Sequence, residues 1–165
     1  MDRFERGFII GVVASGIKDI LSWLDYSILH FTKATYAHLM GVILFGRVVN
    51  TTSELIYSQL VEIGFEGFIG ILFIYFVYRT ENKRNFWFKG ILFANGVYIF
   101  TSAINTFFRL PTLNLMTLET SISTAITSTI FGVFMGLGVY WWGIRIGDFE
   151  SEQTERKKSM RFNLP

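Results

Sequence analysis

Residues 7–29 form an apolar segment that carries two charged residues, Lys18 and Asp19, near its middle. A helix needs about 20 mostly apolar residues to cross a bilayer, and this segment is long enough. Its apolar side chains each favour insertion by roughly 0.3 to 0.6 kcal/mol, whereas each charge costs roughly 2.5 to 3.5 kcal/mol. Because the two sums nearly cancel, we expect a helix that is stable in a membrane only against other helices that satisfy its charged face.

Three further apolar segments, residues 55–78, 86–108 and 121–144, are also long enough to span a membrane. Of the 165 residues, 51% are hydrophobic and 18% aromatic, which is more apolar than an ordinary soluble domain. The sequence therefore predicts an all-α polytopic membrane protein with four transmembrane helices. They form a single domain, residues 1–147, and a polar tail follows at residues 148–165.

The region between the first two spans contains a shorter apolar run, residues 39–45, bounded by His38 and Arg47. This run is too short to cross a bilayer. We expect residues 34–49 to contain a short interfacial or re-entrant helix.

The basic residues indicate the orientation of the four spans, because Lys and Arg concentrate in cytoplasmic flanks. Of the fifteen Lys and Arg residues, only Lys33, Arg47 and Arg109 flank the spans on one side. The eleven that flank them on the other side are Arg3, Arg6, Arg79, Lys83, Arg84, Lys89, Arg145, Arg156, Lys157, Lys158 and Arg161. The sequence therefore predicts a multi-pass protein of the cytoplasmic membrane with both termini in the cytoplasm.

Charged and polar residues within the spans are candidate functional groups, because a charge inside a bilayer is costly to keep. Lys18 and Glu66 each lie about 17 Å from the start of their predicted spans, so antiparallel neighbours would bring them level. Glu66 is thus the leading candidate partner for Lys18, with Asp19 as a local competitor. Glu62 lies one turn from Glu66 on the same helix face. The candidate residues are Lys18, Asp19, Asp25, Glu62, Glu66, Asn95 and Asn105.

Small residues recur every three or four positions in the first and fourth spans, where they let helix backbones approach closely. The main examples are Gly7, Gly11, Ser15, Gly132 and Gly136. We favour packing within the monomer over dimerisation for the Gly132-x-x-x-Gly136 pattern. The polar stripes as a whole are interpreted first as packing faces of the bundle. The alternative is that they line a polar cleft for an ion, a proton or a small solute.

Several function classes have little support in this sequence. The chain has no Cys, which excludes thiol catalysis and thiolate metal sites, and it contains no phosphate loop or catalytic Ser motif. His30 and His38 with Asp25 and Glu54 match no metal-ligand spacing. We therefore expect neither an enzyme nor a cofactor or metal site. Nucleic-acid binding is not expected either, because the basic residues sit at segment ends.

One combination of residues resembles a known family. Gly7-x-x-x-Gly11-Val12-Val13 followed by Lys18, with Trp87, Gly90, Gly96 and Pro111 around the third span, is similar to small four-helix bacterial inner-membrane proteins of the YagU type. The resemblance implies a location in the cytoplasmic membrane and an activity that is itself uncharacterised; a role in acid tolerance has been suggested for that family. It carries over one candidate functional residue, Lys18, and has no counterpart for the two glutamates of the second span.

Two functions remain in view. The first is a structural or regulatory membrane protein that acts by binding partners in the bilayer, either a second copy or another membrane protein. The second is a small proton- or ion-coupled transporter or channel component that uses Lys18 and Glu66. We favour the first from sequence, because a four-span monomer has little room for a pathway; a membrane enzyme ranks third.

The predicted topology can be tested by cysteine accessibility, since the native chain has no Cys. In intact cells, an impermeant thiol reagent should label a Cys placed at Asn114 and leave a Cys at Asn82 unlabelled. The physical reason is that the basic loop of residues 80–85 stays in the cytoplasm. Labelling at Asn82 without labelling at Asn114 would overturn the four-span topology.

Overall fold

The computed structural model describes residues 2–80, 85–109 and 116–143, and within these ranges the regular structure is entirely helical. The helices are α1 (Arg3–Leu24) continued by η1 (Asp25–Leu29), α2 (Tyr36–Phe45), α3 (Thr52–Arg79), α4 (Phe86–Phe107), and α5 (Leu118–Gly138) continued by η3 (Val139–Gly143). Four of them are long and apolar enough to span a membrane, and a shorter helix follows the first. The predicted fold class is confirmed. Pro111, the last residue of the predicted fourth span and the polar tail lie outside the described residues.

Three long helices begin earlier than hydropathy predicts, because polar residues cap them. In α1, Glu5 N–H donates to Asp2 Oδ1 at 2.8 Å, and Asp2 N–H donates to Glu5 Oε2 at 3.2 Å, which forms a capping box. Thr51 and Thr117 accept comparable backbone bonds at the starts of α3 and α5. Hydropathy locates the apolar middle of a helix, whereas these caps decide where it starts.

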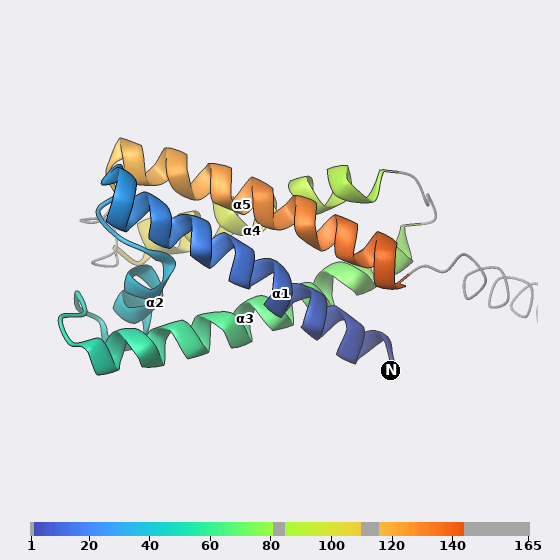
Figure 1. The fold of residues 1–165 in the computed structure, drawn as a ribbon, viewed down its shortest axis with the longest axis horizontal. Coiled ribbons are helices and arrows are strands. Elements are labelled where there is room, and N and C mark those ends of the chain that lie inside the picture. Colours follow the sequence, from blue (N-terminus) through green and yellow to red (C-terminus); the bar gives the residue numbers. More distant parts are fainter. Residues whose placement is uncertain (1, 81–84, 110–115, 144–165) are drawn as a thin grey trace, which may run out of the picture.

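The four long helices run alternately up and down (Figure 1). The start of α1, the end of α3, the start of α4 and the end of α5 share one end of the bundle, while α2 lies at the opposite end. α1 packs mainly against α3 and α5, α4 packs mainly against α5, and α2 packs against α3. The contact between α3 and α4 is slight. As a result, α4 is attached to the bundle chiefly along one side.

Glycines allow two pairs of helices, α1 with α3 and α4 with α5, to approach each other closely. A Cβ built on Gly11 of α1 would meet the carbonyl of Glu66 and lie 3.0 Å from Gly67 Cα of α3. A Cβ on Gly132 of α5 would meet the carbonyl of Gly90 in α4. Gly7, Gly70 and Gly136 are equally confined by backbone of the neighbouring helix. Within this chain, then, these small-residue stripes are contacts between its own helices.

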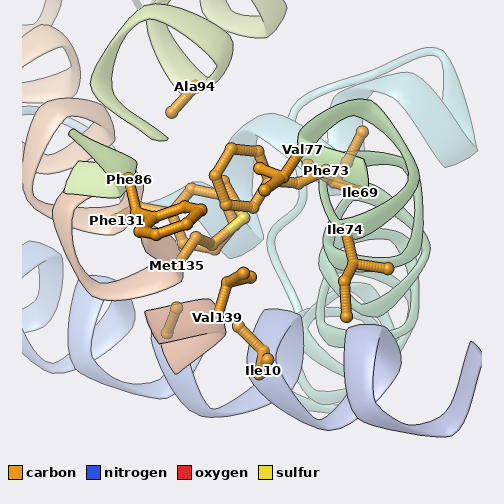
Figure 2. Close-up of a cluster of buried hydrophobic side chains, with 11 residues drawn as sticks. Ile10, Ile69, Phe73, Ile74, Val77, Phe86, Ala94, Phe131, Met135 and Val139 are labelled. Atoms are coloured by element: carbon orange, nitrogen blue, oxygen red, sulfur yellow. The ribbon is translucent and has the colours of Figure 1, made fainter. Parts of the chain in front are cut away.

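Apolar side chains fill the interior toward one end of the bundle, and polar side chains are buried toward the other end. Figure 2 shows the apolar half, where side chains from α1, α3, α4 and α5 point toward one another. Its buried residues are Ile10, Ala14, Ile69, Phe73, Ile74, Val77, Phe86, Ala94, Phe131, Met135 and Val139. These lie in the helix halves near the end that α1 starts from. The other half buries polar groups, namely Ser15, Lys18, Ser22, Ser58, Glu62, Asn105, Thr120, Ser123, Thr124, Thr127 and Ser128.

The α4–α5 contact predicts opposite outcomes for two Gly→Ala substitutions. Gly132→Ala should destabilise the protein by about 1 to 3 kcal/mol, because the added methyl group meets α4 backbone that has no room to move. Gly96→Ala is the matched control, since no heavy atom lies within 4 Å of its added Cβ, and alanine favours a helix by about 1 kcal/mol. Thermal unfolding of the purified protein in detergent measures both. Equal stability of the two variants would contradict this close approach.

Candidate functional site

Lys18 is the centre of a charged cluster in the polar half. Its side chain is 1% exposed, and its ammonium group contacts two carboxylates of α3. One is Glu62, 3% exposed, which accepts a hydrogen bond; the other is Glu66, whose Oε1 lies 2.8 Å from Lys18 Nζ. Asp19 Oδ1 lies 3.8 Å from the same nitrogen. The pairing of Lys18 with Glu66, expected from their equal depths, is present, and Glu62 joins it.

A glutamine ties the acidic residues together. Gln59 Nε2, one turn before Glu62 on α3, donates to Glu62 Oε2 at 2.8 Å and to Asp19 Oδ2 at 2.8 Å. Ser15 Oγ also donates to Asp19 Oδ2, at 3.2 Å. Both hydrogens of one amide thus bridge α1 and α3 through two carboxylates. These hydrogen bonds hold the side chains of Asp19 and Glu62 in place where α1 contacts α3.

Tyr36 brings α2 into contact with the cluster. Its ring centroid lies 3.8 Å from Lys18 Nζ, within the range of a cation–π contact. Its hydroxyl group donates to the carbonyl of Thr124 at 3.0 Å and lies 2.8 Å from Thr127 Oγ1. Tyr36 is the first residue of α2, so α1, α2, α3 and α5 all meet at Lys18.

The cluster has more negative than positive formal charge. Three carboxylates, from Asp19, Glu62 and Glu66, surround the one ammonium group of Lys18. Charges that are removed from water need to be compensated by partners or by protons. The cluster can therefore accept a proton or a further cation, and Glu66, with a 14% exposed side chain, is more accessible than Glu62.

A cavity of about 110 Å³ opens beside the cluster. Lys18, Glu62 and Glu66 line it, together with Tyr36. Polar residues of α4 line another part, namely Tyr98, Thr101, Ser102 and Asn105. The remaining wall is largely apolar and includes Leu39, Met40, Ile43, Phe65, Val97 and Phe131. These ionisable side chains are consequently not sealed by packing but face an open volume.

The structure separates the other predicted polar residues into those at the cavity and those away from it. Asn105 lines the cavity, whereas Asp25 and Asn95 are absent from its wall. Asp25, the first residue of η1, accepts a hydrogen bond from Ser123 and so joins η1 to α5. Asn95 donates to Thr129 Oγ1 at 3.0 Å, which joins α4 to α5. These two residues connect helices.

The histidines do not form a metal site with their acidic neighbours. His38 Nδ1 lies 2.8 Å from Thr35 Oγ1, and Glu54 pairs with Arg47. In residues 2–80, 85–109 and 116–143, no group of three or more His, Asp or Glu side chains is placed to hold a metal ion.

Two residues of the cluster, Gln59 and Tyr36, were not predicted from the sequence. Gln59 had a usable signal, because Gln59, Glu62 and Glu66 follow one another at helical spacing on a single face. Tyr36 had none, since its contact with Lys18 depends on how α2 folds back against α3 and α5.

Comparison with known proteins adds no assignment: the chain matches no family model, no curated protein and no solved structure. The resemblance to YagU-type proteins stays a prediction. The Lys18 cluster and its cavity are therefore the features that bear on function.

The burial of Lys18 with Glu62 predicts strong energetic coupling between them. Lys18→Met should cost about 3 to 5 kcal/mol, because it leaves buried carboxylates without their cation. The double variant Lys18→Met/Glu62→Gln should lose less than the sum of the two single losses. Unfolding of the purified protein in detergent provides these values. The control combines Lys18→Met with Glu119→Gln. Glu119 is exposed in the first turn of α5, so the two losses of stability should add. Additive losses for Lys18 and Glu62 would mean that the two residues are not coupled.

Proposed function

We propose that this protein is a small membrane carrier, or a component of one, that binds a proton or a small cation at the Lys18 cluster. The observation that carries the proposal is the cavity, which reaches Lys18, Glu62 and Glu66 together. Ion pairs that serve only to hold helices together gain nothing from an open volume beside them. Intramembrane ionisable groups next to a cavity are the usual arrangement in ion and proton pathways.

Lys18 acts in this proposal as an internal counter-ion. It compensates Glu62 and Glu66 when the cavity is empty, and an incoming cation competes with it for Glu66. Such competition couples occupancy of the site to the contacts between α1 and α3, because Lys18 belongs to α1 and both glutamates belong to α3. A ligand that changes the balance between two helix arrangements is what alternating access requires.

A carrier fits better than an open channel. Phe73 and Met135 are fully buried in the apolar core, which fills the half of the bundle near the end where α1 starts. A bound ion therefore meets polar groups in one half of the bundle and apolar side chains in the other. Release toward the apolar half needs a rearrangement of helix packing.

We further propose that both termini lie in the cytoplasm and that the cavity occupies the outer half of a cytoplasmic membrane. In Figure 1, α1 and α4 start at the same end of the bundle at which α3 and α5 end. The basic residues that flank the spans in the sequence support placing this end in the cytoplasm. The ligand would then approach from outside.

Partner binding is the second candidate, and one observation favours it. α4 is the least buried of the four long helices and presents large apolar side chains outward. Examples are Leu92, Ile99, Phe100 and Phe107. Lipid tails cover such a face, and a helix of another membrane protein fits it equally well.

Purified protein in liposomes distinguishes the two candidates. If the chain carries protons or cations, it should dissipate an imposed pH gradient, and Glu66→Gln should reduce that rate about tenfold or more by removing the accessible carboxylate. An entrapped pH-sensitive dye measures the rate. The matched control is Glu119→Gln, which removes a carboxylate outside the cavity and should leave the rate unchanged.

Liposomes that stay tight across a broad pH range, with folded protein confirmed in them, would exclude autonomous transport. Partner binding would then be the remaining candidate. Equal loss of flux in Glu66→Gln and Glu119→Gln would separate the activity from the cluster.

A further inference from the structure

We infer that the cavity beside Lys18 is a binding site for a small organic cation, a protonated amine that carries a compact apolar group. This inference rests on the proposed function and names the ligand class of the same site. Four features of the cavity lead to it: its surplus of carboxylates, an unpartnered amide, its apolar wall and its position against α4.

The charges select the sign of the ligand. The Lys18 ammonium group already contacts Glu62, Glu66 and the ring of Tyr36. The positive charge of Lys18 is therefore already compensated by these groups and is not available to bind an anionic ligand. Glu66, by contrast, lines the cavity, and in the part of the chain described here Lys18 is the partner of its carboxylate. A cation placed in the cavity can bind Glu66 by a charge-assisted hydrogen bond.

Asn105 supplies an independent indication of a ligand. It lines the cavity from α4 and is 6% exposed, yet its side-chain oxygen Oδ1 has no hydrogen-bond partner among the described residues. A buried amide oxygen without a partner costs free energy, and a donor from a ligand would satisfy it. A protonated amine supplies such an N–H donor, so Asn105 offers it a second polar contact beside Glu66.

The wall of the cavity favours an organic body on that cation. Met40 and Ile43 of α2, Phe65 of α3 and Val97 of α4 line it with apolar groups. A small hydrated ion gains nothing from this surface, whereas an alkyl or aromatic group gains by leaving water. Small-molecule sites combine an apolar lining with a few polar groups in the same way.

The packing of α4 gives the ligand a route. Residues of α2 and α3 form one side of the cavity and residues of α4 form another, while α3 and α4 barely contact each other. An amine with an apolar group partitions into the membrane and can reach the cavity between these helices.

Binding to the full-length protein in nanodiscs tests this inference, with benzylamine as the probe. Benzylamine joins one ammonium group to one small ring; benzyl alcohol has the ring without the charge, and potassium chloride supplies a cation without the ring. Isothermal titration at neutral pH should show saturable binding of benzylamine, and at least tenfold weaker binding of both comparators. Equal binding of benzyl alcohol would overturn the requirement for charge, and equal binding of potassium would replace the organic cation by an inorganic one.

Two cavity variants and one control locate the binding. Glu66→Gln should weaken benzylamine binding about tenfold or more, as expected for loss of a hydrogen bond to a charged group. Asn105→Leu, of similar size, should weaken it about two- to tenfold and keeps the result interpretable if Glu66→Gln does not fold. Glu119→Gln should bind benzylamine like the unmodified protein. Unchanged binding in both cavity variants would overturn the site.

The outcome also separates this inference from the proposed function. Benzylamine binding that depends on Glu66, in protein whose liposomes stay tight, would support the amine site and reject autonomous transport. Glu66-dependent proton flux without benzylamine binding would support the carrier and reject an amine as its ligand.

Discussion

The burial of one ammonium group governs this bundle. Lys18 lies in the middle of a helix that otherwise consists largely of apolar and small residues, and it is 1% exposed. A lone charge in a bilayer would cost several kcal/mol, so its partners must come from neighbouring helices. Glu62 and Glu66 of α3 and Tyr36 of α2 provide them. The contacts of Lys18 thus link α1 to both α2 and α3.

A second consequence of burying Lys18 is that polar and apolar side chains are buried in opposite end halves of the bundle. Charged and hydroxyl side chains occupy one half, where many of them bond across a helix contact or to the preceding turn of their own helix, as Thr124 does with the carbonyl of Thr120. The other half is closed by aromatic and aliphatic packing around Phe73 and Met135. Segregation places polar groups near one another, so that Lys18, Glu62, Asp19 and Gln59 can satisfy one another.

Glycine determines which helices can come close enough for this arrangement. Gly11 and Gly70 bring α1 against α3, and Gly90 and Gly132 bring α4 against α5. No comparable pair joins α3 to α4 in the described residues, and those two helices contact each other only slightly. The cavity lies where the close contacts stop. The same residues that tighten two helix pairs thus leave space between the pairs.

The sequence by itself determined the four spans, the helix-packing role of glycine and the level pairing of Lys18 with Glu66. Hydropathy, residue spacing and the rise of a helix are local properties, and they are enough for those conclusions. Only the tertiary structure decided that Glu62 also contacts Lys18, that Tyr36 covers it, and that a cavity with Asn105 in its wall lies beside the cluster. These features depend on how far each helix is rotated and on which helices are neighbours. Such relations arise from contacts between distant parts of the chain, which no stretch of sequence encodes on its own.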